Sequence, residues 1–369
     1  MAVRRGAVEN LVRVDFWRGR RVLITGHTGF KGGWLTIWLD RLGAQLHGYA
    51  LPPPAGEQLF SAAGIEQCIK TTYGDIRDLD LFRDVVRRAQ PEFIFHLAAQ
   101  SLVRPSYEDP VGTYSTNVMG VVNLLEATRA CDSVRAVLIV TSDKCYENRE
   151  WLWGYREDES MGGYDPYSSS KGCAELVAAA YRRSFFPPTH YQQHRVAIAT
   201  ARAGNVIGGG DWAQDRLVPD FVRAAVTGEE LLIRSPHAVR PWQHVLEPTM
   251  GYITLAEQLA LAGPAVSEAW NFGPHEGDAR PVSWLVENLV KLWGEEARWR
   301  VDDNHLHPHE AHYLKLDTSK ARARLHWAPR WSLYEALARV VEWYRAQRDG
   351  QDVRQVCLDQ IAAYERAGA

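Results

Sequence analysis

A tyrosine and a lysine four residues apart, Tyr167 and Lys171, are the residues of this chain best placed for proton transfer. They lie at the start of a helix predicted over 167–185, and a spacing of four puts both side chains on one helix face. A free tyrosine has a pKa of about 10, so a phenolate base near neutral pH needs stabilisation of about 4 kcal/mol. The ammonium of Lys171 could supply part of it. Taken alone, the pair also fits an ordinary surface contact.

A glycine-rich turn near the start of the chain is the second candidate for chemistry. Gly26, Gly29 and Gly32 are spaced G-x-x-G-x-x-G between an apolar stretch at 22–25 and an amphipathic helix predicted over 33–42. Glycine lets the backbone approach a pyrophosphate, and a helix N-terminus offers free N–H groups to phosphates. The turn therefore predicts a dinucleotide site, and a tight turn without ligand is the alternative. An oxidised nicotinamide would add a second positive charge beside the phenol.

Strand and helix patterns alternate through the first half of the chain. The expected strands are 21–25, 45–50, 69–74, 92–98, 135–142 and 195–201, with helices at 33–42, 78–89, 111–131 and 167–185. Several strands are apolar throughout, which is typical of a parallel sheet covered on both faces. The sequence predicts an α/β fold with a doubly wound parallel sheet, which binds ligands at the carboxyl ends of its strands.

The second half alternates less regularly, with helical patterns at 216–227, 247–262, 282–293 and 332–346. We expect a mainly dinucleotide-binding domain over 15–201 and a smaller α/β substrate domain over 202–346. Some segments of the substrate domain are expected to return to the dinucleotide-binding domain. Residues 347–369 are expected to form a C-terminal helix or tail. The irregular stretch at about 145–166 is long for a compact domain, and its aromatic content predicts an ordered loop near a ligand.

Composition excludes several classes of protein. The chain has 369 residues and a formal net charge of −3, which argues against a broad basic face for nucleic acid. No apolar run approaches the ~20 residues of a membrane helix, and residues 1–14 are too polar for a signal peptide. The five widely spaced cysteines fit reduced thiols, not a disulfide framework or zinc site. We expect a cytoplasmic enzyme with neither nucleic-acid nor membrane partners.

Together the motifs resemble the extended branch of the short-chain dehydrogenase/reductase family. The matching segments occur in family order over about 21–330, at 25–32, 74–76, 96–99, 117, 141–142, 167–171 and 271–274. The resemblance implies a Rossmann-like fold whose cofactor is held by Gly26, Thr28, Gly29, Phe30, Gly32, Asp75, Ile76, Leu97, Ala98, Ala99, Asn117, Tyr167 and Lys171. In that family Asp75 holds the adenine amino group and Lys171 grips the nicotinamide ribose. A turn aspartate and small packing residues are the simpler alternatives.

The segment after the second expected strand departs from the family pattern. Residues 46–54 include no Asp or Glu that could bind the adenosine ribose hydroxyls. No Lys or Arg occurs between 46 and 69 that could meet a 2′-phosphate. An added phosphate would lack a local cation, so the sequence favours NAD over NADP as the cofactor.

The run Thr141-Ser-Asp-Lys-Cys-Tyr146 narrows the resemblance to nucleotide-sugar 4,6-dehydratases. In the family Ser142 hydrogen-bonds the substrate hydroxyl, and dehydratases add two proton-handling residues, here Asp143 and Lys144. Oxidation at sugar C4 acidifies the C5 proton. A base then removes that proton while an acid protonates the departing C6 hydroxyl, and hydride returns to C6.

The resemblance implies that Asp143 is the acid and Lys144 the base. One alternative is an ion pair between the two residues that only anchors a loop. In another, Lys144 orients the sugar and the base is a water or Glu147.

Lysine at this place, followed by the aromatic run 151–155, resembles the CDP-glucose 4,6-dehydratase group, as do 26–35 and 51–54. The resemblance implies conversion of CDP-D-glucose to CDP-4-dehydro-6-deoxy-D-glucose, which feeds deoxysugar synthesis for surface polysaccharide such as lipopolysaccharide O-antigen. The alternatives are another nucleotide-sugar 4,6-dehydratase or a 4-epimerase or dehydrogenase of the family. A dinucleotide sensor without catalysis is a third interpretation.

Polar residues of the second half are candidates for substrate binding. Family precedent puts Asn205 on the diphosphate side, and Arg216 begins a helix that could face the nucleotide. Arg240 resembles a family arginine that grips a phosphate, and Arg280 is a further cation. Solvated surface roles are the alternative for each arginine.

Two further expectations concern metals and assembly. His305, His307, His309 and His312, with Glu310, have spacings that could hold a metal, but the expected chemistry needs none, so no metal is predicted. Members of the family usually pair through two helices of each subunit, which implies a homodimer or homotetramer.

Overall fold

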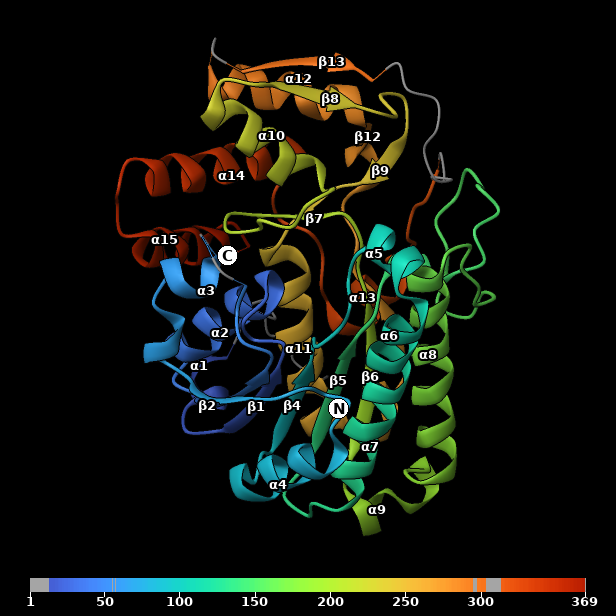
Figure 1. Cartoon of the computed structure of the whole chain (residues 1–369). Helices are drawn as coiled ribbons and strands as arrows, with labels where there is room; N and C mark the ends of the chain where they lie inside the picture. The colour runs from blue at the N-terminus through green and yellow to red at the C-terminus, as the bar shows by residue number, and fades with distance from the viewer. Residues whose placement is uncertain (1–12, 55, 57, 295–296, 303–312, 369) are drawn as a thin grey trace, which may run out of the picture.

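The computed structural model describes residues 13–54, 56, 58–294, 297–302 and 313–368. Its centre is a seven-stranded sheet of order β11-β6-β5-β4-β1-β2-β3 in which all neighbouring strands are parallel (Figure 1). The strands are β1 (Arg21–Thr25), β2 (Gln45–Ala50), β3 (Lys70–Tyr73), β4 (Phe93–His96), β5 (Ala136–Val140), β6 (Ala197–Arg202) and β11 (Ala269–Asn271). The predicted α/β class and its parallel sheet are confirmed, and β11 is a strand that the sequence did not predict.

Alternate residues of each strand enter different cores because side chains alternate across a sheet. Val22 and Ile24 belong to one apolar cluster, and Leu23 between them belongs to another. The first cluster includes residues of α2 (Phe30–Arg41), α11 (Leu246–Ala262), α14 (Leu333–Arg348) and α15 (Val353–Arg366). The second includes residues of α4 (Leu79–Ala89), α7 (Gly120–Arg129) and α8 (Pro166–Ser184). Both faces are therefore covered, which explains why the strands are apolar throughout.

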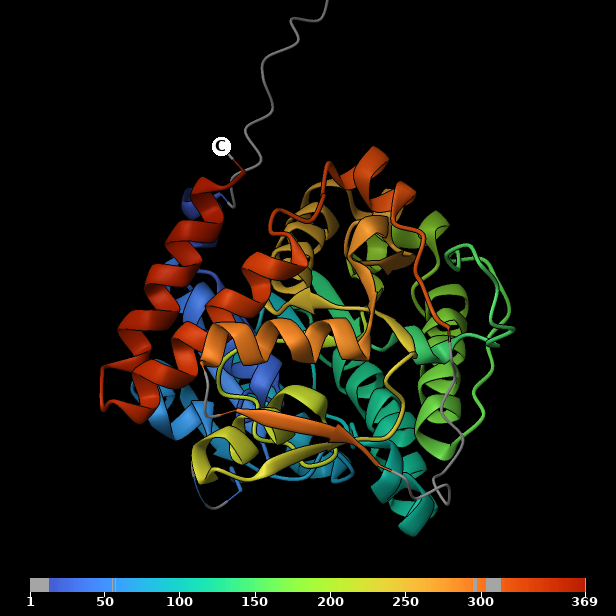
Figure 2. The ribbon, with the colours of Figure 1, turned by 90° about the horizontal axis from the view of Figure 1, so that it is seen from above.

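A second group of elements gathers at the end of the sheet that appears at the top of Figure 1. It contains α10 (Leu217–Thr227), β8 (Glu230–Ile233), β9 (Val239–Pro241), β12 (Ala279–Pro281), α12 (Val282–Trp293) and β13 (Arg298–Val301). The view from above shows β8 and β13 running together beside α12 (Figure 2). Although α11 and β11 follow residue 202, they belong to the layers of the central sheet.

The structure also bears on the expectations for membrane-spanning helices and for disulfide bonds. In the described ranges, no helix is long and apolar enough to cross a membrane. All five cysteines are free thiols.

The contact between α1 (Val14–Trp17) and α11 holds a buried carboxylate with a testable pH effect. Oε1 of Glu257 accepts hydrogen bonds from Trp17 Nε1 at 2.6 Å and from the Arg13 amide at 3.3 Å, and burial raises the pKa of Glu257 to about 7. An unfolded glutamate has a pKa of about 4.3. Between these two pH values the folded state keeps a proton on Glu257 that the unfolded state has lost. The free energy of unfolding therefore falls as pH rises through this window, by about 4 kcal/mol at most.

We expect the free energy of unfolding, measured with urea from pH 4.5 to 7.5, to decrease with pH. Glu257→Gln keeps the acceptor for Trp17 but cannot titrate, so its slope should be shallower. Part of the slope should remain, because burial also raises the pKa of Glu247 to about 7. Identical slopes in wild type and Glu257→Gln would contradict this assignment.

Candidate active site

The expected site residues meet at the point where the order of the sheet reverses. From β1 the chain proceeds outward to β2 and β3, and then resumes on the other side of β1 with β4. Thr25 joins the carboxyl ends of β1 and β4, because its hydroxyl pairs with His96 Nδ1 at 2.8 Å and accepts the amides of Leu97 and Ala98 at 3.2 Å each. Crevices at such switch points are where doubly wound sheets bind ligands.

The glycine turn leads from β1 into α2. Gly26 has φ +74°, and a Cβ there would overlap the backbone of Ala98; a Cβ at Gly32 would overlap the carbonyl of Gly26. Gly29 is the N-cap of α2 and supplies no side chain, so the first N–H groups of the helix have no cap. Thr28 donates its hydroxyl to the carbonyl of Leu51 at 3.1 Å and fixes the turn against the end of β2. The sequence placed the helix start at 33, whereas it begins at Phe30.

Asp75 and Ile76 lie at the end of β3, as predicted. The Asp75 carboxylate accepts the Arg77 amide at 2.9 Å and the Arg77 Nε at 3.0 Å, and these contacts lower its pKa. An adenine amino group would therefore share this carboxylate with Arg77. Ile76 is buried, and Leu97, Ala98 and Ala99 follow β4 as partly exposed residues at the switch point.

Asn117 lies in a π-helical turn (Ser115–Met119) before α7, and its amide makes three hydrogen bonds within the protein. Its Nδ2 donates to Ser170 Oγ at 2.8 Å and to the Gln100 carbonyl at 2.9 Å, and its Oδ1 accepts the Gln100 amide. Asn117 thus connects α8 to the segment that follows β4. Both N–H donors of the amide are used by these bonds, whereas Oδ1 can still accept one further hydrogen bond.

Tyr167 and Lys171 are both buried in the first turns of α8. Asp165 caps this helix by accepting the Ser168 amide at 2.9 Å, and Pro166 occupies its first position. Burial raises the pKa of Tyr167 to about 12, although a hydrogen bond with Ser142 and the charge of Arg216 oppose the rise. Burial also lowers the pKa of Lys171 to about 8. The sequence predicted that Lys171 would lower the pKa of the phenol; in the structure, burial dominates.

Ser142, Asp143 and Lys144 follow β5 in a short 3-10 turn (Asp143–Cys145). Ser142 Oγ donates to Asp143 Oδ1 at 3.0 Å, and Asn205 Nδ2 donates to Asp143 Oδ2 at 3.3 Å. A Cβ at Gly204 would overlap this carboxylate, so the glycine leaves room for it. Asp143 is buried and Lys144 is partly exposed. Within the described ranges, no ion pair joins Lys144 to Asp143, so the structure does not support the loop-anchoring alternative.

The four substrate residues predicted in the second half of the chain fall into two places. Asn205 contacts Asp143, and Arg216 bonds Asp211 at 2.9 Å and Ser101 at 3.3 Å while its charge acts on Tyr167. Arg240 and Arg280 lie directly opposite each other across the antiparallel β9–β12 pair, which puts both side chains on one face. The structure therefore brings these two distant arginines together, which sequence reasoning had only treated singly.

Lys31 is a charged residue of the site that sequence reasoning missed. It lies in the first turn of α2, is partly exposed, and has a pKa that burial lowers to about 8. The charges that act on it are those of Arg216, Asp143, Lys171 and Asp211. The available signal was a lysine between the last two glycines of the turn, where a charge has to face the ligand crevice or solvent.

The aromatic loop after Lys144 is held by isolated β-bridges and contains stacked rings. Tyr146 bridges to Met161 and Tyr155 to Leu316, and the rings of Trp151 and Tyr155 stack at 5.6 Å. A hollow of about 790 Å³ is lined by residues of this loop within 156–161, of α8 and of α13 (Ser319–Leu325). Its lining includes Glu175 and Arg202 but not Ser142, Tyr167 or Lys171, so this hollow is separate from the candidate site.

No metal site emerges in the described part of the chain, where no cluster of three or more His, Cys, Asp or Glu is arranged to hold an ion. The histidine cluster that the sequence analysis considered and rejected as a metal site lies outside the described residues: His305, His307, His309 and His312, with Glu310.

Known proteins identify the family. The family model for GDP-mannose 4,6 dehydratase matches residues 23–340. The CDP-glucose 4,6-dehydratase of Salmonella typhimurium is 53% identical over 357 residues, which cover 97% of this chain and 99% of that protein. A dTDP-glucose 4,6-dehydratase of Streptomyces niveus is 28% identical, with 89% and 94% covered.

Solved structures share the fold at lower identity. The dTDP-glucose 4,6-dehydratase DesIV of Streptomyces venezuelae, solved with NAD bound, has a TM-score of 0.74 at 24% identity and covers 90% of this chain and 99% of its own. A UDP-glucose 4-epimerase of Thermotoga maritima has a TM-score of 0.73 at 21% identity and covers 89% and 99%. Dehydratases and epimerases thus share one architecture. Sequence and fold together show that the chain belongs to the family described by the GDP-mannose 4,6 dehydratase model, within the extended short-chain dehydrogenases/reductases.

Proposed function

We propose that this protein is a hydro-lyase that uses bound NAD to convert CDP-D-glucose to CDP-4-dehydro-6-deoxy-D-glucose. The observation that carries the proposal is the 53% identity, over nearly the full length of both chains, to the Salmonella typhimurium CDP-glucose 4,6-dehydratase. The adjacent Asp143 and Lys144 support dehydration over simple epimerisation, because an epimerase needs only Ser142, Tyr167 and Lys171. The product would enter deoxysugar synthesis for surface polysaccharide, such as lipopolysaccharide O-antigen.

The turn between β1 and α2 fits a dinucleotide. Its glycines leave the space that Cβ atoms would fill, and the uncapped N–H groups of α2 form the positive end of the helix dipole. NAD would supply hydride acceptance at C4 and hydride return at C6 when bound. Residues 46–69 contain no Lys or Arg, which favours NAD over NADP.

Tyr167 acts as the base for the C4 hydroxyl, and Ser142 hydrogen-bonds the same oxygen. The phenol needs positive charge nearby, because burial raises its pKa to about 12. Arg216 already acts in the required direction, and Lys171, whose pKa is about 8, is mostly protonated at neutral pH. Oxidation at C4 should therefore accelerate as pH rises, until Lys171 loses its proton.

Asp143 and Lys144 handle the two proton transfers of elimination. Asp143 protonates the departing C6 hydroxyl, and the Lys144 amine removes the C5 proton. Two donors, Ser142 Oγ and Asn205 Nδ2, hold the Asp143 carboxylate, whereas Nζ of Lys144 has no hydrogen bond or ion pair to any described residue. Lys144 is consequently available to the substrate.

The substrate diphosphate is assigned to the cations at the mouth of the site. Arg216 extends toward Tyr167, and Arg240 and Arg280 form a second positive position on the β9–β12 pair. A guanidinium fork suits bidentate phosphate binding. Asn205, whose Nδ2 donates to Asp143 Oδ2 at 3.3 Å, is a neutral polar group beside these cations.

Lys31 gives this binding a pH dependence. Its pKa of about 8 means that its positive charge is present below pH 8 and is lost above it. We expect the affinity for CDP, measured by calorimetry from pH 6.5 to 9.5, to fall about threefold to tenfold above pH 8, since one charge near a phosphate is worth about 1 kcal/mol. Lys31→Arg keeps the charge throughout and should remove this part of the fall. Lys171 titrates in both proteins, so parallel curves for wild type and Lys31→Arg would exclude Lys31 from the binding site.

We propose a homodimer or homotetramer in the cytoplasm. Exposed apolar side chains on α8 and on the helical segments before α7 support pairing through these elements: Val111, Tyr114, Met119 and Leu176. The five free thiols support a reducing compartment.

A panel of nucleotide sugars tests the proposed function. The purified protein is incubated with NAD and each of CDP-, dTDP-, UDP- and GDP-linked hexoses, and products are read by mass spectrometry. We expect loss of one water from CDP-glucose without net formation of NADH. Conversion of CDP-glucose to CDP-galactose would establish the epimerase alternative, and binding of NAD without turnover of any sugar would establish the sensor.

A further inference from the structure

A buried ion pair lies behind the turn that carries Asp143 and Lys144. Nε and Nη2 of Arg202 donate to Oε1 and Oε2 of Glu175 at 3.0 and 2.9 Å, and the two side chains are only 4% and 3% exposed. Two parallel bonds of this kind are the strong form of an arginine–carboxylate contact. Burial disfavours the charged form of both side chains. The opposite charge of the partner and the hydrogen bonds between the two outweigh burial, so the pKa of Glu175 is lowered and that of Arg202 is raised.

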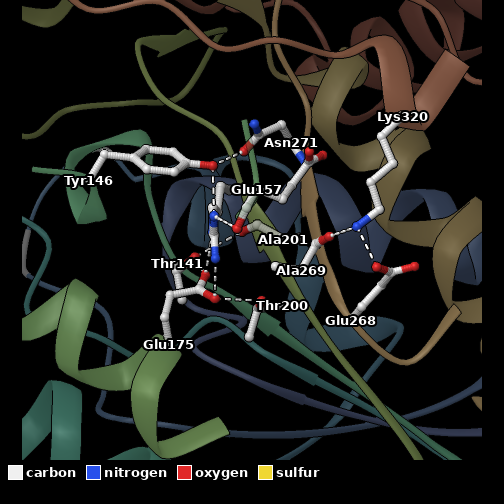
Figure 3. Close-up of polar contacts among 11 residues, drawn as sticks. Thr141, Tyr146, Glu157, Glu175, Thr200, Ala201, Glu268, Ala269, Asn271 and Lys320 are labelled. Carbon is white, nitrogen blue, oxygen red and sulfur yellow. Dashed lines mark hydrogen bonds and ion pairs between the residues drawn. The ribbon is translucent and has the colours of Figure 1, made fainter. Parts of the chain in front are cut away.

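This pair contacts both ends of the turn (Figure 3). At one end Thr141 Oγ1 donates to Glu175 Oε1 at 2.6 Å, and at the other Arg202 Nη1 donates to the Tyr146 hydroxyl at 2.6 Å. Tyr146 then donates to Asn271 Oδ1 at 2.8 Å. The segment between Thr141 and Tyr146 contains Ser142, Asp143 and Lys144. One charge pair thus bounds the candidate acid and base from both sides.

The same pair also reaches the helix of Tyr167 and Lys171. Glu175 lies one helical turn after Lys171 on α8, whereas Arg202 ends β6. The position of Tyr167 is set by the capped start of α8, whereas the 3-10 turn of Asp143 and Lys144 is three residues long and its cap, Ser142 Oγ accepting the Lys144 amide at 3.2 Å, lies within the turn segment. Because this cap does not reach α8, the register of the turn against α8 depends on contacts with other elements, including those at its two ends.

We propose that Glu175 and Arg202 are positioning residues that hold Asp143 and Lys144 in register with Tyr167, through Thr141 and Tyr146. The inference rests on the proposed function. Its consequence is that proton transfer at C5 and C6 depends on this pair more than oxidation at C4 does, because small misplacements of reacting groups are costly.

Three conservative variants test the positioning role while the ion pair of Glu175 and Arg202 stays intact. Thr141→Val and Tyr146→Phe each remove one contact between the pair and the turn. Thr200→Val is the matched control, because Thr200 Oγ1 donates to the same carboxylate at 2.7 Å but belongs to β6, outside the turn. Products of one turnover with CDP-glucose are separated by mass into the 4-keto sugar that keeps its C6 hydroxyl and the dehydrated sugar. Thermal unfolding is recorded in parallel.

We expect Thr141→Val and Tyr146→Phe to slow dehydration at least tenfold and C4 oxidation less than threefold, so the 4-keto sugar with its C6 hydroxyl accumulates. Thr200→Val should keep the wild-type product ratio, even if its thermal unfolding midpoint falls as far as those of Thr141→Val and Tyr146→Phe. Equal ratios in all four proteins, or an equal change in all three variants, would overturn the positioning role alone. Failure of the wild type to dehydrate any nucleotide sugar would instead refute the proposed function, and this proposal with it.

Discussion

Tyr167→Phe should lower kcat for CDP-glucose by about a thousandfold, because it removes the hydroxyl that takes the C4 proton. A positioned acid or base typically contributes 10²- to 10⁴-fold. The phenyl ring still fills the buried first turn of α8, so the fold and the affinity for CDP should change little. Rates of product formation and of C4 oxidation in a single turnover measure the effect, and both should fall together.

Tyr252→Phe is the matched control for this prediction. Tyr252 is a fully buried tyrosine whose charge environment includes Tyr167 and Asp143, and within the described chain its hydroxyl has no hydrogen-bond partner. Its replacement removes the same atom without removing a proton path, so kcat should stay within about threefold of wild type. Full activity in Tyr167→Phe would overturn the oxidation scheme. A comparable loss in both variants would attribute the effect to packing.

The sheet could be predicted from the sequence because its strands carry their own signal. Continuous apolar runs such as 93–97 and 136–140 indicate burial on both faces, and the first six strands lie close to their expected places. β11 could not be predicted, because Ala269–Asn271 is three residues long and exists only through its pairing with β6. A strand that depends on a partner more than sixty residues away leaves no local pattern.

The difference between a local sequence pattern and a long-range contact also explains which site residues could be predicted. Tyr167 and Lys171 reveal themselves by spacing on one helix, whereas the ion pair of Glu175 and Arg202 joins residues 27 apart whose charges suggest solvent exposure. Arg240 and Arg280 meet only through a short antiparallel pair. The pKa of Tyr167 was also beyond sequence reasoning, because it depends on how fully the packed structure buries the phenol. Contacts that only tertiary packing creates cannot be predicted from local sequence patterns.

Lys144→Ala should abolish dehydration while C4 oxidation continues. The amine is the only group assigned to the C5 proton, so exchange of that proton with solvent should stop, and product formation should fall by 10²- to 10⁴-fold. The measurement is deuterium incorporation at C5 in heavy water, read by mass spectrometry with the yield of 4-keto sugar. Unchanged exchange would remove Lys144 from the base role. Glu147→Gln is the companion variant, because loss of exchange there would transfer the role to Glu147.

Lys144→Arg separates a base from a charge that orients the sugar. Arginine keeps the positive charge and a similar reach, but it cannot be deprotonated in a protein. If Lys144 removes the C5 proton, Lys144→Arg should be as defective in exchange as Lys144→Ala while it binds CDP-glucose like wild type. If Lys144 only orients the sugar, arginine should restore much of the dehydration. Because no described residue bonds Nζ of Lys144, neither variant breaks a contact that the structure shows, and the difference between them reports on the proton itself.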